Sequence, residues 1–204
     1  MWNLLTRTNQ QYEYVSFRVT VLWLLGFILR YCILFPFRLL LFFFACSYTL
    51  LSTYFIGLLP DSKFKRWLNF RGMKVLHRIL SRVFSAIIRF HNPENRAACG
   101  SICVANHTSP IDIIILSTDN AYSFIGQKHE GFTGIMQKAF SRASNHIWFD
   151  RGESKDRSLV SKRMHAHCQN SNNCPILIFP EGTCINNTSV MMFKKGCFEI
   201  DTTV

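Results

Sequence analysis

The segment NHTSPID at residues 106–112 contains His107 and, five positions later, Asp112. On one continuous helix these two side chains would be about 140° apart around the axis and could not touch. Ser109 is a typical N-cap and Pro110 suits the first helical position, so we expect the helix to begin after His107. The Asp112 carboxylate could then reach back to the imidazole and form a pair able to deprotonate a hydroxyl group. A capped helix with an uninvolved histidine remains the alternative at this point.

A second polar turn follows an apolar run near the end of the chain. Residues 175–179 are PILIF, and they are followed by Pro180, Glu181, Gly182 and Thr183. A glycine at such a turn allows the backbone to approach a ligand closely, and the Glu and Thr side chains can bind hydroxyl groups. An ordinary β-turn is the alternative interpretation of this segment.

Together, NHTSPID and FPEGT resemble the signatures of the glycerolipid acyltransferase family. The longer run FPEGTCINNTSVMMFKKG is more similar to the endoplasmic-reticulum glycerol-3-phosphate acyltransferases of types 3 and 4 than to the lysophosphatidate or lysophosphatidylcholine enzymes. The resemblance extends from about Arg7 to the last residues. It implies an enzyme of lipid biosynthesis that transfers a fatty acyl chain from acyl-CoA to the sn-1 hydroxyl of glycerol 3-phosphate. It implies no cofactor and no metal.

The resemblance also assigns a role to each residue of the candidate site. His107 would be the general base and Asp112 the carboxylate that orients it. Arg151, in the run WFDR, would bind the substrate phosphate, and Glu181, Gly182 and Thr183 would bind the acceptor. A further short apolar strand containing proline would follow Ile200 in this family, so we expect the chain to be truncated at its C-terminus. A lysophospholipid acyltransferase and an inactive, membrane-bound binding module remain alternative functions.

The region from residue 101 to 204 alternates short apolar runs with helical stretches, which predicts one α/β domain with a largely parallel sheet flanked by helices. In such sheets, functional groups collect in the loops at the carboxyl ends of the strands. The strands are expected at Ile102–Ala105, Tyr122–Ile125, His146–Phe149 and Ile176–Phe179, and the helices at Ile111–Ser117, Gly131–Arg142 and Lys155–Gln169.

The first 62 residues indicate a membrane-anchoring region. Leu39–Leu59 is a run of 21 residues without a charge, long enough to cross a bilayer of roughly 30 Å. Val19–Leu34 is almost as apolar, although Arg30 interrupts it. Two arrangements therefore remain open: a single span at Leu39–Leu59, or a helical hairpin bent around residues 36–38, where Pro36 lies. Either one would place a membrane helix before the acyltransferase domain.

Residues 63–100 follow as a basic amphipathic helix and a polar linker. The helix is expected at Lys63–Phe90, with a break or a kink near Gly72. The chain has 23 Lys and Arg against 12 Asp and Glu, a net charge of +11, which favours anionic partners such as phosphates and lipid headgroups. Basic residues after the apolar run place the rest of the chain in the cytosol by the positive-inside rule. With the resemblance, this predicts an endoplasmic-reticulum membrane location. The aromatic residues gather in the membrane region, which argues against nucleic acid.

Overall fold

The computed structural model describes residues 16–150, 157–186, 188–200 and 202–204. At its centre is a four-stranded sheet in which all three neighbouring pairs are parallel, with the order β1-β4-β2-β3. The strands are β1 (Ile102–Val104), β2 (Ser123–Gln127), β3 (Ile147–Phe149) and β4 (Ile176–Ile178). Helices α5 (Ile111–Leu116), α6 (Gly131–Ala143) and α7 (Arg157–Cys168) connect them. The predicted α/β architecture is confirmed, and within this domain the bounds of the predicted strands and helices differ by only one or two residues where they are described.

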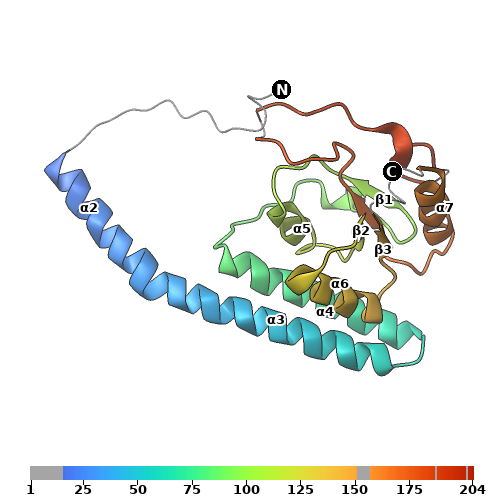
Figure 1. Ribbon diagram of the computed structural model, residues 1–204, viewed down its shortest axis with the longest axis horizontal. Coiled ribbons are helices and arrows are strands. Elements are labelled where there is room, and N and C mark those ends of the chain that lie inside the picture. The colour runs from blue at the N-terminus through green and yellow to red at the C-terminus, as the bar shows by residue number, and fades with distance from the viewer. Residues whose placement is uncertain (1–15, 151–156, 187, 201) are drawn as a thin grey trace.

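Alternate residues of each strand enter two hydrophobic cores, one on each face of the sheet. In β4, Ile176 packs with Ile102, Ile147 and Met164 of α7. Leu177 points to the opposite face and packs with Phe124 and with residues of α4, α5 and α6. The side-chain period of two in a strand therefore explains why both faces of this short sheet are apolar and both are covered by helices (Figure 1).

The N-terminal apolar region is one continuous helix. It runs through α2 (Phe17–Ile28), a π-helical segment (Leu29–Leu34) and α3 (Phe35–Leu58) without turning back. The hairpin bent around residues 36–38 is therefore wrong, and the single helix is the arrangement that the structure has. Pro36 lacks an amide N–H, and the wide π-helical turn just before it accommodates that missing hydrogen bond within the helix.

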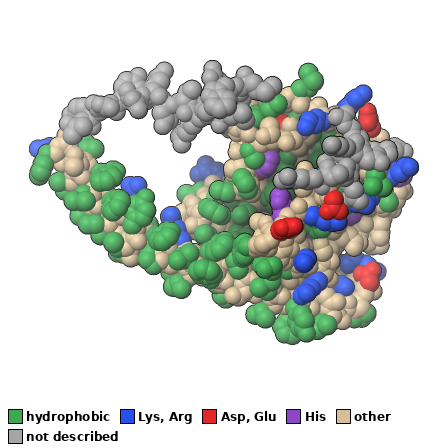
Figure 2. Space-filling model, in the orientation of Figure 1, with side chains coloured by type: hydrophobic (Ala, Val, Ile, Leu, Met, Phe, Trp, Pro, Cys, Tyr) green, Lys and Arg blue, Asp and Glu red, His purple; other side chains and the backbone are tan. Residues whose placement is uncertain are grey.

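This helix is long and apolar enough to cross a membrane. Its two halves have different surroundings. In α2 and the π-helical segment no residue is buried, and Figure 1 shows α2 extending away from the rest of the molecule. In α3, by contrast, Ala45, Thr49, Thr53 and Ile56 form a buried stripe, because α3 packs against α4 and α6. On the face seen in Figure 2, hydrophobic side chains predominate along this helix, with a few basic side chains among them.

Helix α4 (Lys63–Val83) runs beside α3 and is uninterrupted, so the predicted break near Gly72 is wrong. The helix also ends earlier than Phe90. Its last turn is closed by hydrogen bonds from Ser85 N to Arg82 O and from Ala86 N to Ser81 O, both 3.0 Å, with Ser85 in a left-handed conformation at φ 52°. This is a Schellman motif, and it directs the chain away from the helix axis.

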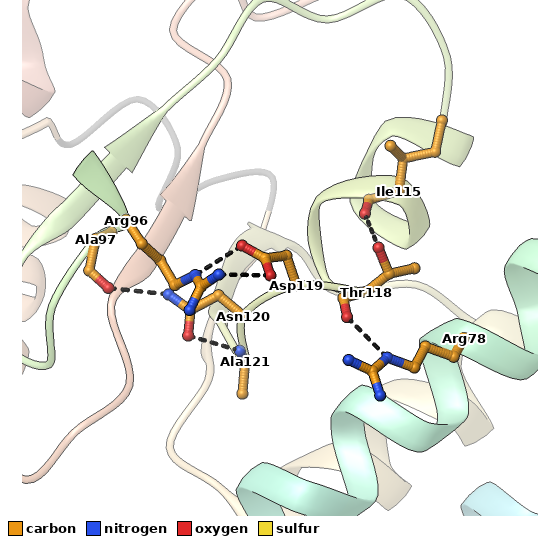
Figure 3. A network of polar contacts seen from close by, with 8 residues as sticks. All are labelled: Arg78, Arg96, Ala97, Ile115, Thr118, Asp119, Asn120 and Ala121. Carbon is orange, nitrogen blue, oxygen red and sulfur yellow. Dashed lines mark hydrogen bonds and ion pairs between the residues drawn. The ribbon is translucent and has the colours of Figure 1, made fainter. Parts of the chain in front are cut away.

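A polar network connects the segment before β1 to the end of α5 (Figure 3). The Arg96 guanidinium donates two hydrogen bonds to the carboxylate of Asp119, at 2.6 and 2.7 Å. The Asn120 amide donates to Ala97 O at 2.9 Å, and Arg78 of α4 donates to Thr118 O at 3.2 Å. These bonds fix α5, whose first turn carries Asp112, relative to the sheet and to α4.

Candidate active site

His107 and Asp112 are in contact. His107 lies in the turn between β1 and α5, and Asp112 lies in the first turn of α5, as the capping pattern predicts. The imidazole Nδ1 is 3.0 Å from Asp112 Oδ2, and each side chain is 18% exposed. The Ser109 hydroxyl accepts a hydrogen bond from Ile111 N, while Asp112 Oδ2 accepts one from Ser109 N. The N-cap residue of α5 is Pro110, one position after the predicted Ser109, and the backbone of this helix start brings the carboxylate to the histidine.

Four hydrogen bonds converge on the Asp112 carboxylate. Besides the imidazole, Thr108 N and Ser109 N donate to Oδ2 at 2.7 and 3.0 Å, and the Thr108 hydroxyl donates to Oδ1 at 2.9 Å. Burial alone would raise the pKa of Asp112, but these donors outweigh it and lower the pKa below its ordinary value. Asp112 is therefore a carboxylate at neutral pH, and only the protonated Nδ1 of His107 can donate to it. When the imidazole is neutral, its proton is therefore on Nδ1, and Nε2 is the nitrogen without a proton.

The ring of His107 is held on one face by Phe179, at the carboxyl end of β4. The two rings are stacked with centroids 4.1 Å apart and planes 17° apart. Ile185 N donates to His107 O at 2.9 Å, which fixes the backbone of the same residue. No hydrogen bond joins Nε2 to a residue in the described part of the chain. The lone pair of this nitrogen can therefore accept a proton from a bound hydroxyl group.

Glu181 lies close to His107, and its carboxylate accepts hydrogen bonds from backbone N–H groups. Its side chain is 2% exposed. Oε2 accepts a hydrogen bond from His107 N at 2.7 Å, and Oε1 accepts one from Met191 N at 3.0 Å. The carboxylate is thus engaged with the backbone of two loops. In this structure Glu181 positions the histidine turn, and its assignment to acceptor binding remains a prediction.

The remaining predicted residues lie around the same turn or outside the described residues. Gly182 has a left-handed φ of 72°, and a Cβ on it would collide with the Nζ atom of Lys194. Thr183 is exposed at the next position. Arg151 belongs to residues 151–156, which lie outside the described residues, so its predicted phosphate contact remains a prediction.

Two residues of this site were not singled out as such by sequence reasoning. Phe179 is the first residue of the FPEGT motif, but its stacking partner is 72 positions away, as the numbers of the two residues show. Lys194 has no distinguishing signal among the basic residues of the sequence, although its Nζ atom lies over Gly182. Within the described residues, no group of three or more His, Cys, Asp or Glu side chains is arranged to hold a metal ion.

The site lies at the carboxyl edge of the parallel sheet. His107 follows β1, and Phe179 and Glu181 follow β4, which pairs directly with β1. Ala105 N donates to Ile178 O at 3.2 Å just beyond the strands, so the two loops leave the sheet side by side. This arrangement combines the His107 imidazole, an anionic partner and the nearby Lys194 side chain. It can accept a proton from a hydroxyl group beside a bound anion.

Comparison with known proteins connects this geometry to a family. Residues 87–204 match the acyltransferase family. The whole chain is 53% identical over 203 residues to glycerol-3-phosphate acyltransferase 3 from Homo sapiens and to glycerol-3-phosphate acyltransferase 4 from the same organism. It covers 47% and 44% of these two proteins, so the chain spans about half the length of the curated relatives that it matches.

A solved structure has a similar fold. It is the crystal structure of the 1-acyl-sn-glycerophosphate acyltransferase PlsC from Thermotoga maritima, with a TM-score of 0.59 at 20% sequence identity. The similarity covers 83% of this chain and 68% of that one. It therefore includes part of the N-terminal helices as well as the sheet.

Proposed function

This chain belongs to the acyltransferase family, and on that premise we propose that it is an acyl-CoA-dependent glycerol-3-phosphate O-acyltransferase whose product is lysophosphatidic acid. The observation that carries the proposal is the pair formed by His107 Nδ1 and Asp112 Oδ2 at 3.0 Å, with the opposite ring nitrogen available. The names of the relatives with 53% identity support glycerol 3-phosphate as the acceptor.

The chemistry follows from the protonation states of the pair. Nε2 of His107 accepts the proton of the sn-1 hydroxyl as its oxygen attacks the thioester carbon of acyl-CoA. The imidazolium that forms is stabilised by the Asp112 carboxylate. Collapse of the tetrahedral intermediate breaks the carbon–sulfur bond, and the departing CoA thiolate takes the proton back from Nε2. The transfer is balanced and regenerates the neutral imidazole without an acyl-enzyme.

Positive charge beside the histidine favours a phosphate-bearing acceptor. Lys194 lies over Gly182, next to Glu181, whose carboxylate accepts from the histidine backbone. In this proposal Lys194 and Arg151 bind the phosphate of glycerol 3-phosphate, while exposed Thr183 contacts the acceptor hydroxyls. A lysophospholipid as acceptor is the second candidate, because the same phosphate group and one free hydroxyl are present in lysophosphatidate.

The same proposal includes the membrane. In this proposal the apolar helix anchors the protein in the bilayer of the endoplasmic reticulum, and the acyltransferase domain faces the cytosol. We place the span in the unburied half, residues 17–37, which at 1.5 Å per residue reaches roughly 30 Å. The buried stripe of α3 supports this choice, since that half is already packed against α4 and α6.

The test is an acyl-transfer assay on membranes that contain this chain, with radiolabelled acyl-CoA and either glycerol 3-phosphate or lysophosphatidate as acceptor. A second preparation carries the chain extended by the remaining C-terminal part of a glycerol-3-phosphate acyltransferase relative. We expect acyl transfer to glycerol 3-phosphate, at least in the extended chain. Transfer to lysophosphatidate alone would favour the second candidate. In each preparation the unsubstituted chain is compared with its His107→Ala variant. If acyl transfer were equal in the two, for both preparations, the proposed acyltransferase activity would be refuted.

A further inference from the structure

Large apolar side chains are exposed in the segment that connects α4 to β1. Residues 84–90, FSAIIRF, follow the last residue of α4, and Phe84, Ile87 and Phe90 among them are exposed. Ile87 is 88% exposed, a larger fraction than that of any leucine, isoleucine or valine in the apolar helix. Single exposed apolar residues are common on soluble proteins, whereas three within seven positions indicate a surface that another molecule covers.

The 84–90 segment lies beside the first turn of α3. Nη2 of Arg38 donates a hydrogen bond of 2.7 Å to the hydroxyl group of Ser85. Arg38 directly follows the proposed span at residues 17–37, and Figure 1 shows that the end of α4 preceding the segment is the end nearer to α2. Ile87 is two residues beyond Ser85, so its Cα atom is within roughly 7 Å of the Ser85 Cα atom. The segment is therefore at the level where the proposed span leaves the bilayer.

Positive charges without an acidic partner surround the segment. Arg82, in the last turn of α4, and Arg89 are exposed, and Arg38 is partly exposed. None of the three makes an ion pair with a residue that the structure describes. The sequence also has no Asp or Glu between Asp61 and Glu94. Exposed apolar side chains among unpaired arginines match the interface of an anionic bilayer, where apolar groups enter the acyl boundary and guanidinium groups bind headgroup phosphates.

A similar composition at the other end of α4 has a different position. Phe64 and Trp67 are exposed there, and their rings stack with centroids 6.1 Å apart. The Arg71 guanidinium lies over the Trp67 ring, 5.8 Å from its centroid. From Trp67 to its last residue, α4 rises roughly 25 Å at 1.5 Å per residue. Because α4 runs beside α3, a bilayer crossed by residues 17–37 would contact the 84–90 segment and leave Phe64 and Trp67 in water.

We propose that the 84–90 segment is a second membrane contact, which binds the surface of an anionic bilayer. Its three exposed apolar side chains enter the boundary between headgroups and acyl chains, and the three arginines bind lipid phosphates. The inference rests on the proposed span at residues 17–37 and adds to it a contact made by the domain. A single spanning helix can tilt, and a second contact limits this tilt and fixes the orientation of the acyltransferase domain at the bilayer.

The experiment places a tryptophan in the segment by Ile87→Trp, in the full chain with its four native tryptophans replaced by phenylalanine. The exposed position tolerates the larger ring. Two further chains retain only Trp67, as the matched control, or only Trp23, which reports on the span. Each chain is reconstituted into vesicles of phosphatidylcholine with or without phosphatidylserine. The quenchers are phosphatidylcholine brominated near the headgroup or deep in the acyl chain, and aqueous iodide.

Bromine near the headgroup should lower the fluorescence of the Ile87→Trp chain by about half or more, because interfacial apolar groups lie about 5–10 Å inside the boundary. The chain that retains Trp67 should be quenched several times less. Omitting phosphatidylserine should reduce the quenching of the Ile87→Trp chain about twofold or more, because it removes the attraction between the arginines and the lipids. Adding Arg82→Glu with Arg89→Glu should have the same effect for the same reason.

The charge control is Lys63→Glu with Arg71→Glu, which changes the charge equally at the other end of α4 and should leave the quenching unchanged. If iodide but not brominated lipid quenched the Ile87→Trp chain, while deep bromine quenched Trp23, the second contact would be overturned and the span retained. Shielding from both quenchers would also overturn it, because protein, such as a second copy of this chain, would then cover the segment. Quenching equal to that of Trp67 would overturn it as well, since the whole of α4 would then lie against the bilayer. Loss of lipid quenching at Trp23 too would overturn the span itself.

Discussion

The Glu181 carboxylate connects two loops of the candidate site through hydrogen bonds from His107 N and Met191 N. Glu181→Gln replaces one acceptor oxygen with an NH₂ group, so one buried N–H loses its acceptor. We expect a loss of about 1–3 kcal/mol in the free energy of unfolding. We also expect reduced acyl transfer, because the histidine turn is no longer held. Denaturant unfolding and the acyl-transfer assay measure the two effects.

Glu199→Gln is the control for this substitution, because Glu199 is exposed and its carboxylate is 3.6 Å from Lys195 in a surface ion pair. It should change neither stability nor rate appreciably. If Glu181→Gln were as stable as the parent and affected only the KM for glycerol 3-phosphate, Glu181 would bind the acceptor directly. That result would favour the role that the family resemblance assigned to it.

Gly182 lies in a left-handed conformation that side chains rarely adopt, and the mobile end of Lys194 lies over it. Its φ is 72°, and a Cβ would collide with Lys194 Nζ. Gly182→Ala should therefore lower stability by about 1–2 kcal/mol and displace the Lys194 ammonium, which should raise the KM for glycerol 3-phosphate. Gly196→Ala is the matched control, since a Cβ there meets no atom within 4 Å. Thermal unfolding and steady-state kinetics of the two variants test this, and equal effects of both would contradict it.

The contact between His107 and Asp112 was predictable because it depends on local chemistry. Ser109 and Pro110 fix where the helix begins, and this places the carboxylate next to the turn. Glu181 was not predictable in the same way. Its partner His107 N is 74 residues away, and only the pairing of β1 with β4 brings the two together.

At the scale of secondary structure, the strands were predictable because each is a short apolar run bounded by turn residues. The end of α4 was not. The left-handed residue that closes it is Ser85, where glycine is the usual signal, so the apolar periodicity suggested a helix as far as Phe90. Gly72 suggested a break, but it faces α3, where Tyr48 and Ile56 would lie near an added Cβ, and tertiary packing maintains the helix there.

His77 of α4 is a buried titratable group at the interface with the sheet. It is 3% exposed, its Nδ1 atom donates to Met73 O at 2.7 Å, and its ring packs against Phe124 of β2. Burial lowers the pKa of His77 from 6.5 to about 4, which outweighs the effect of the backbone hydrogen bond. The neutral form is therefore the one that the fold accommodates.

This makes the fold acid-sensitive. Below pH 6.5 the unfolded chain binds a proton that the folded chain does not, so stability decreases as the pH falls from 6.5 towards 4. The loss from His77 alone should be about 1 kcal/mol by pH 5.5. His77→Leu should reduce this slope in denaturant unfolding, whereas His91→Leu, at an exposed position, should leave it unchanged. A slope that is identical in His77→Leu and the parent would contradict the assignment.

At the scale of the whole molecule, the sequence indicated a membrane helix but not which part of it is free to cross the bilayer. Charge-free Leu39–Leu59 was the stronger candidate by composition. The structure shows that part of this run packs against α4 and α6, and that residues 17–37 extend away from the domain. Composition could not reveal this, because the small and polar residues of the packed stripe, Ala45, Thr49 and Thr53, are also common in membrane helices.

Tryptophan fluorescence can locate the span. Trp23 lies in α2 and is 58% exposed, and Trp67 lies on α4 and is 54% exposed. In variants that retain only one of these tryptophans, phospholipids brominated deep in the acyl chain should quench Trp23 strongly. Trp67 lies just after the turn between α3 and α4, remote from residues 17–37, so brominated phospholipids should quench it much less than Trp23. If Trp23 were accessible to aqueous iodide and insensitive to the brominated lipids, residues 17–37 would not span the bilayer.

The central claim is that His107 and Asp112 act as one catalytic unit. The most direct measurement is kcat for acyl transfer to glycerol 3-phosphate by His107→Ala, Asp112→Asn and the double variant, in an active extended chain whose folding is verified by thermal unfolding. Each single substitution should lower kcat by about 10²-fold or more, and the double variant should be little worse than the slower single variant. Multiplicative losses in the double variant, or parental rates after either single change, would contradict the account.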